Sequence, residues 1–161
     1  MSVTLFETEA FDQLTEQACS SQRKRAHRNL HASLDEKCQR MLVAMEPDSY
    51  VPPHRHRNPA KPELLTILRG SICVLLFDDV CSITQVIRCE VGGSTTGCDL
   101  PPGVWHSIIS LQTGTIFLEA KPGPYERLLP EDFGAWAPSE NDATASNYLK
   151  QLHENASTQI C

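Results

Sequence analysis

Two histidine-containing motifs constrain the fold of this chain more than any other feature of its sequence. The first runs from His54 to Gly70 and consists of a His-x-His pair, Glu63 after six residues and the glycine after six more. On an extended strand, side chains at positions i and i+2 lie on one face, so His54 and His56 can converge while Arg55 points away. Two imidazoles and a carboxylate suit a divalent first-row metal ion. The first motif therefore predicts a metal site built on β-strands.

The second motif is Pro-Pro-Gly-Val-Trp-His, over residues 101–106. Proline fixes the backbone and glycine permits a tight bend, so this segment predicts a rigid turn that leads into a strand. We expect His106 to supply a third imidazole and to complete a set of four ligands. Such a set leaves one or two positions open on a five- or six-coordinate ion, as metal-assisted chemistry requires. Trp105 should point away from the ion and serve packing or an interface.

The chemistry of these ligands does not select one metal. Affinity for divalent ions follows a general series that does not identify the ion bound in the cell. Iron(II), manganese, nickel and zinc all remain open. Zinc is our first expectation for a bound ion, because histidine and carboxylate ligands suit it and it is commonly available.

At these residues the chain resembles the cupin superfamily, whose first motif has His-x-His, Glu and Gly and whose second is Pro-x-Gly-x-x-His. Both motifs are present in that order. The chain departs from the family pattern at Asp48 and Thr95, where glycines are expected, and at Ser110, where asparagine is expected. None of these positions is a ligand, so the departures concern loop geometry. The resemblance implies an all-β fold, the cupin double-stranded β-helix or jelly-roll barrel, with one divalent metal ion inside.

The chain also resembles one cupin subgroup, the WbuC-type metalloproteins encoded among genes for bacterial surface-polysaccharide synthesis. The matching segments are residues 28–33, 50–56, 76–79, 119–125 and 132–140. The subgroup usually has lysine before Asp132 and proline before Trp136, where this chain has Glu131 and Ala135. The resemblance implies a metal-dependent enzyme that acts on a sugar or sugar nucleotide. Isomerase, epimerase, hydrolase and oxygenase chemistry all remain open, because one fold hosts many reactions.

Glu119 and Lys121 are the candidate catalytic residues. They lie two apart on a predicted strand, so both can face the same side. If that side is the barrel interior, they border the ion as acid/base or substrate-orienting groups. The alternative is an ion pair on the surface. Tyr50 has the strand parity of His54 and could reach the same cavity as a substrate-binding residue.

The N-terminal part of the chain offers two further candidate residues and one basic cluster. Arg28 and His31 could bind substrate by capping the pocket, or could hold the N-terminal helix to the barrel. A local cationic cluster of residues 23–25, next to Arg28, could touch an anionic ligand or belong to a solvated loop.

The length and charge of the chain limit what it can do. With 161 residues there is room for one domain with a single core. A net charge of -6 without a long basic run argues against nucleic acid as a routine partner. The seven cysteines include no Cys-x-x-Cys pair, so we expect reduced thiols, with Cys73 and Cys89 in the core.

Hydrophobic periodicity predicts three regions. Residues 1–37 form an extension with a short amphipathic helix at 8–22, and residues 38–126 form an antiparallel sandwich or barrel, which the resemblance identifies as the cupin barrel. Within the barrel, residues 64–77 predict two strands joined by a tight turn at Gly70. Residues 127–161 form an extension that packs on the barrel through Phe133 and Trp136. We expect a helical turn at 147–153 and mobility in the last residues.

The first residues carry no secretory signal, and no stretch is long and apolar enough to span a bilayer, so we expect a cytoplasmic protein. A homodimer is the default expectation for a cupin barrel. The partner of the site would be a small molecule. A non-catalytic module, in which the metal assists small-molecule binding or regulation, is the rival function, and a closed structural metal site is a third.

Overall fold

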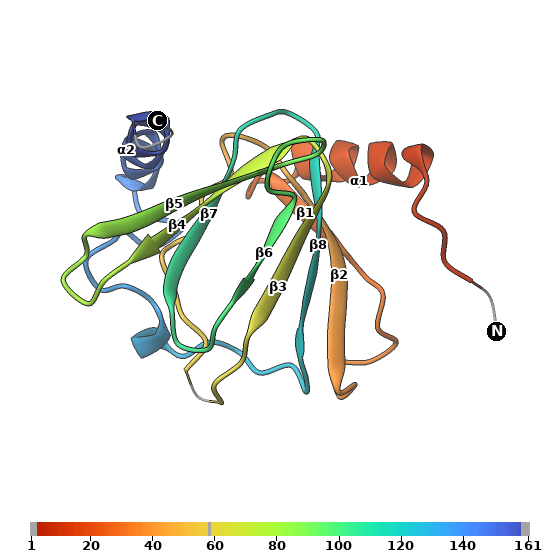
Figure 1. The fold of residues 1–161 in the computed structure, drawn as a ribbon, viewed down its shortest axis with the longest axis horizontal. Coiled ribbons are helices and arrows are strands. Elements are labelled where there is room, and N and C mark those ends of the chain that lie inside the picture. Colours follow the sequence, from red (N-terminus) through yellow and green to blue (C-terminus); the bar gives the residue numbers. More distant parts are fainter. Residues whose placement is uncertain (1–2, 58, 159–161) are drawn as a thin grey trace.

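The strands form two antiparallel sheets that face each other in the computed structural model, which describes residues 3–57 and 59–158 (Figure 1). One sheet has the order β1-β2-β8-β3-β6 and the other β5-β4-β7. The strands of the first sheet are β1 (Arg25–Asn29), β2 (Cys38–Met45), β3 (Glu63–Arg69), β6 (Gly97–Leu100) and β8 (Thr115–Pro122). Those of the second are β4 (Ser71–Phe77), β5 (Ile83–Glu90) and β7 (Trp105–Ser110). The chain passes repeatedly from one sheet to the other, as in a jelly roll, so the predicted fold class is confirmed.

The main core lies between the two sheets. Val43 from β2 and Phe117 from β8 meet Val74 from β4 and Ile108 from β7 there. These side chains alternate with residues of the outer faces along each strand, which is the period that the sequence shows. The barrel therefore has an apolar interior. The candidate ligands lie at one end of it, near the first residues of β3 and β7.

Two helices cover the outer faces on opposite sides of the molecule (Figure 1). Helix α1 (Thr8–Ser20) buries Leu14 and Ala18 against Leu42 of β2 and Ile116 of β8. This confirms the helix predicted at residues 8–22. The segment 1–37 contributes a strand as well, because β1 pairs with β2 along its whole length.

Helix α2 (Ala145–Thr158) is longer than the helical turn predicted at 147–153. Its buried residues Leu149 and Leu152 pack on Leu75 of β4. This contact with the outer face of the smaller sheet stabilises turns that the polar sequence alone does not favour. It also explains why β4 is buried on both faces. Residues 159–161, for which we predicted mobility, lie outside the described residues.

The segment between the barrel and α2 includes a short 3-10 helix (Pro130–Asp132) and the predicted anchors. The ring of Trp136 lies 4.9 Å from that of Trp105 and 6.4 Å from that of Phe77. Trp105 serves packing, as predicted, and its indole N–H donates to Asp79 at 3.0 Å. None of the helices in the described part of the chain has the length and apolar character needed to cross a membrane.

Gly70 and Gly92 allow a matched test of the turn that carries the chain from β3 to β4. Both have φ of 75°, but a Cβ on Gly70 would meet the side chain of Thr115, whereas a Cβ on Gly92 would meet nothing within 4 Å. Gly92→Ala should lower the free energy of unfolding by about 1 kcal/mol, the cost of a left-handed alanine. Gly70→Ala should lower it by roughly 2–3 kcal/mol because steric strain is added. Urea denaturation checks this, and equal losses in the two variants would contradict it.

Candidate metal centre

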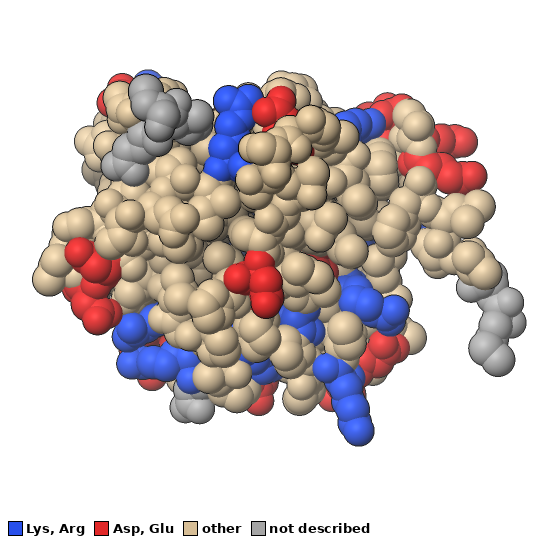
Figure 2. All heavy atoms as spheres, viewed as in Figure 1, with Lys and Arg blue, Asp and Glu red and all other residues tan. Residues whose placement is uncertain are grey.

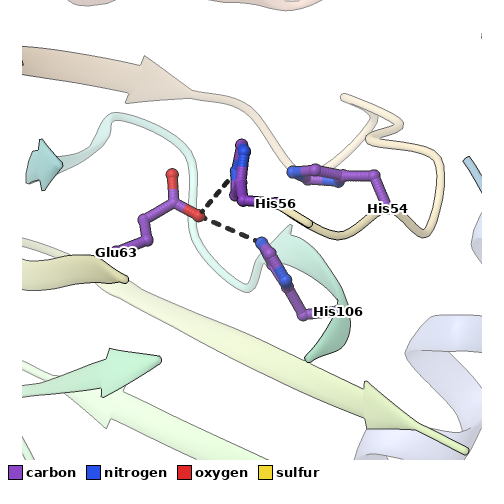
Figure 3. Close-up of side chains that lie close together, drawn as sticks. All are labelled: His54, His56, Glu63 and His106. Carbon is purple, nitrogen blue, oxygen red and sulfur yellow. Dashed lines mark hydrogen bonds and ion pairs between the residues drawn. The ribbon is translucent and has the colours of Figure 1, made fainter. Parts of the chain in front are cut away.

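Four side chains from two distant parts of the sequence converge at one end of the barrel (Figure 3). Glu63 is the first residue of β3, His106 is the second residue of β7, and the other two histidines precede β3. One ligand atom from each of the four lies within 4.8 Å of the others. The ligand atoms of His54, His56, Glu63 and His106 therefore lie close enough together to hold one metal ion, which is the arrangement predicted from the motifs.

The two motifs are joined through their backbones. The amide of His54 donates to the carbonyl of His106 at 2.9 Å, and the amide of His106 donates back to the carbonyl of His54 at 2.9 Å. The amide of Gly103 also donates to the carbonyl of His56 at 3.0 Å. The conformation of the second motif thus fixes where the histidines of the first motif lie.

The His-x-His segment does not belong to a regular strand, contrary to the sequence prediction. His54 makes isolated bridges to His106 on one side and to Phe133 on the other. Pro52 and Pro53 precede it and lack the amide protons that a continuous ladder needs. Instead, the C-terminal segment supports this part of the chain, since Gly134 donates to the carbonyl of Pro53 at 2.8 Å.

Hydrogen bonds to backbone carbonyls set the protonation of two imidazoles. The Nδ1 atom of His54 lies 3.1 Å from the carbonyl of Pro52, and that of His106 lies 3.0 Å from the carbonyl of Val104. A carbonyl only accepts, so Nδ1 carries the proton and donates it in both histidines. The Nε2 atom of each ring then carries a lone pair rather than a proton, and this outer hydrogen bonding is typical of metal-bound histidine.

Lys121 orients the carboxylate of Glu63. Its Nζ lies 3.2 Å from Oε1 of Glu63, while Oε2 of the same group lies 3.1 Å from Nε2 of His106 and 3.4 Å from Nε2 of His56. The Nε2 atom of His56 is buried and makes no hydrogen bond to the described residues. Several lone pairs thus face one another in a buried space, and a cation among them would satisfy all of them. The donor set fits a divalent metal ion.

The local environment favours the protonation states that a metal needs. Burial raises the pKa of Glu63, but the contacts with the imidazoles of His106 and His56 and the charge of Lys121 outweigh it and hold that pKa well below its usual range. Burial, reinforced by the neighbouring His106, holds the pKa of His54 well below its ordinary value. At neutral pH the carboxylate is charged and His54 is neutral, as metal binding requires.

Glu119 and Lys121 face the barrel interior beside the cluster. The Lys121 Nζ lies 2.6 Å from Oε1 of Glu119, and both side chains are largely buried. Burial and the charge of Glu63 raise the pKa of Glu119 to about 7, although Lys121 works against this rise. Burial lowers the pKa of Lys121, but the two carboxylates outweigh it and raise that pKa. The pair does not lie on the surface, which was the alternative reading of its spacing.

Three other predicted site residues lie away from the cluster. The hydroxyl of Tyr50 donates to the carbonyl of Pro138 at 2.9 Å, and its ring packs on Tyr148. His31 is buried, and its Nδ1 atom is hydrogen-bonded to the backbone of Arg40. Arg28 is exposed on β1. None of these three predicted residues is among those that line the cavities next to the candidate ligands. Their roles in substrate binding stay predictions.

His54 borders three cavities in the described part of the chain. One of 270 Å³ lies within the barrel, between apolar residues such as Met45 and Phe117 and the polar pair Glu119 and Lys121. A second of 180 Å³ lies at the barrel end beside the segment 122–128. The third and largest, of 690 Å³, lies between His54 and the C-terminal segment. A small molecule can therefore lie against the ligands from more than one side.

Sequence reasoning missed several residues near the site. Gln39 and Lys61 line the 180 Å³ cavity, and Arg127 lines the 690 Å³ cavity. Of the N-terminal cluster, Arg23 and Arg25 also line the largest cavity. The basic cluster at 23–25 indicated that those two arginines could contact a ligand. No local sequence pattern indicates such a role for Gln39, Lys61 or Arg127. Their positions depend on which loops meet at the barrel end.

Comparisons with known proteins support the fold and leave the activity open. A family model described as "Domain of unknown function (DUF6016)" matches residues 6–89. This match covers more than half of the chain and includes three of the four candidate ligands. No curated protein matches the sequence.

Solved structures resemble the chain at low sequence identity. KdgF from Halomonas sp. aligns with a TM-score of 0.51 and 11% identity, over 66% of this chain and 85% of that one. A conserved protein of unknown function from Streptococcus pyogenes, SPY1581, aligns with a TM-score of 0.50 and 12% identity, over 79% and 92%. A cupin 2 domain-containing protein from Halorhodospira halophila gives 0.49 and 14%, over 85% and 83%. The first two likenesses show a shared fold, and none of the three assigns an activity.

Glu63→Gln tests whether the carboxylate is a ligand. The amide keeps the size of the side chain but loses its charge, so zinc affinity should fall at least about 10- to 100-fold. Titration calorimetry of chelator-treated protein with zinc measures this. Glu90→Gln is the matched control, because Glu90 pairs with Arg88 on β5, outside the residues of the cluster. Equal zinc affinity of Glu63→Gln and the unsubstituted protein would contradict the assignment.

Proposed function

The chain belongs to the family described as a domain of unknown function, DUF6016, and we propose that it is a metal-dependent small-molecule enzyme with a cupin fold. One observation carries the proposal. Four candidate ligands lie together at the end of a barrel, with a buried carboxylate–ammonium pair next to them and cavities beside them. A purely structural metal site would need neither the pair nor the cavities.

The Nε2 atoms of His54, His56 and His106 and the Oε2 atom of Glu63 would hold the ion. When bound, a divalent metal supplies Lewis acidity toward substrate oxygens or a more acidic bound water. The protein keeps these ligands oriented through the carbonyls of Pro52 and Val104 and through Lys121. Zinc, iron(II), manganese and nickel remain candidates for the ion.

Glu119 and Lys121 would move protons to and from the substrate. They form an ion pair and border the same 270 Å³ cavity as His54 and Glu63. A group that borders both the ion and a cavity can reach a substrate atom whose acidity the metal increases. Met45 and Phe117 give the same cavity an apolar wall.

We propose further that the substrate is a sugar or a sugar nucleotide and that the chain is a WbuC-type cupin. This part rests on the resemblance of segments such as 50–56 and 132–140 to that subgroup. The cavity of 690 Å³ beside His54 has the size of a site for such a molecule. A role in surface-polysaccharide synthesis, a homodimer and a cytoplasmic location belong to the same proposal.

The rival function is a non-catalytic module in which the metal assists the binding of a small molecule. That function would be favoured if Glu119 and Lys121 faced solvent and left only an apolar cavity beside the ion. Both groups lie inside the barrel, so the geometry favours the enzyme.

Replacement of both motif histidines tests the metal site. Protein with His54→Ala and His56→Ala should retain its circular dichroism spectrum and lose stoichiometric metal, because two of four ligands are gone. Metal content is measured by mass spectrometry on protein purified without added ions. His27→Ala, which removes an exposed histidine on β1, should keep the metal. Full metal retention in the double variant would refute the assignment.

Lys121→Met tests proton transfer. Metal-loaded protein is incubated with nucleoside diphosphate sugars in deuterated water, and conversion and deuterium uptake are followed by NMR. Lys121→Met should slow the reaction about 100-fold or more while metal content is kept, and Lys150→Met on α2 should not. Equal rates in Lys121→Met and the unsubstituted protein would exclude the role. If metal-loaded protein converts none of the sugars and exchanges no protons, the binding module is favoured instead.

A further inference from the structure

We propose that the 690 Å³ cavity beside His54, called here the arginine cavity, binds the phosphate of an organic phosphate substrate and that Arg127 is the residue that recognises it. The inference rests on the proposed function, because the same substrate would reach the metal with its other end. His54 borders both the arginine cavity and the cluster, so one molecule can contact both.

The charge of the arginine cavity is opposite to that of the whole protein. The chain carries 20 acidic and 14 basic residues, and its net charge is -6. In the arginine cavity, Arg23, Arg25 and Arg127 are accompanied by a single carboxylate, that of Glu140. Figure 2 shows Lys and Arg side chains interspersed with Asp and Glu along the lower edge of the molecule, where Figure 1 shows the loops that precede β3 and follow β8. A locally positive cavity in an acidic protein favours an anionic ligand.

The three arginines differ in what they can offer to a ligand. Arg25 is engaged, since its Nη2 lies 2.6 Å from Glu140 and its Nη1 donates to the carbonyl of Tyr50 at 2.9 Å. Arg23 makes one contact with the same carboxylate at 2.8 Å and is 61% exposed. Arg127 is exposed and makes no hydrogen bond or ion pair with another described residue. Its guanidinium is therefore free to bind two oxygens of a phosphate.

The size and lining of the arginine cavity fit a phosphate that carries a ring. A volume of 690 Å³ lies within the usual range for a small-molecule site, of about 300–1,000 Å³. Phe133, Pro52 and Pro130 supply an apolar wall on which a ring can lie. A nucleoside diphosphate, free or bearing a sugar, combines these features: a flat base, a dianionic group for Arg127 and hydroxyls that can reach toward the metal.

Calorimetric titration with uridine diphosphate tests the inference, with uridine and glucuronate as the uncharged and carboxylate probes. We expect uridine diphosphate to bind and the other two to bind at least tenfold more weakly. Arg127→Gln should weaken binding of uridine diphosphate about 10- to 100-fold, as expected for the loss of a charge-assisted bidentate contact. Arg127→Glu should weaken it further, because it places a carboxylate near the phosphate. The unfolding temperature of both variants should match that of the unsubstituted protein, because this side chain makes no hydrogen bond or ion pair with the residues that the structure describes.

Arg88→Gln is the matched control, since Arg88 lies on β5 and does not line the arginine cavity. The inference is overturned if Arg127→Gln binds uridine diphosphate as tightly as the unsubstituted protein, or if Arg88→Gln weakens binding equally. It is also overturned if glucuronate binds more tightly than uridine diphosphate. The titrations are run on zinc-loaded and on chelator-treated protein. Binding that depends on Arg127 in protein that fails to take up zinc would support the phosphate site and refute the metal function. Zinc uptake without such binding would refute the phosphate site alone.

Discussion

The reciprocal backbone hydrogen bonds between His54 and His106 determine the rest of the site. They join two motifs that are far apart in the sequence, at a place where the first motif has no strand of its own. In each of these two histidines, Nδ1 also donates a hydrogen bond to a backbone carbonyl. This bond fixes the orientation of the imidazole ring in addition to its position. The ligand set is thus organised by the backbone before any metal arrives.

The same end of the barrel combines several groups that are costly to bury. Glu63 is buried as an anion, and Lys121 is buried as a cation between Glu63 and Glu119. Such groups destabilise a fold unless they are paired or bind an ion. Their concentration beside open cavities, rather than in a closed core, favours a role in chemistry. The apolar interior formed by both sheets supplies the stability that the charged end lacks.

The sequence predicted the parts of this protein that depend on local pattern. Hydrophobic periodicity, the glycine turn between β3 and β4, and the order of the two motifs were sufficient for the barrel and the four ligands. The positions of Tyr50 and Arg127 could not be predicted in this way. Tyr50 follows the packing of α2, and Arg127 depends on the path of the C-terminal segment, and both are tertiary effects. The proline pair before His54 likewise replaced an expected strand with isolated bridges.

X-ray absorption spectroscopy of zinc-loaded protein tests the central claim most directly. Three imidazoles and a carboxylate should give only nitrogen and oxygen neighbours, at about 2.0–2.2 Å, with the multiple scattering of histidine rings. The chain has seven cysteines, so sulfur is a real competitor for zinc. Sulfur neighbours at about 2.3 Å would place the ion at cysteines and contradict the metal centre.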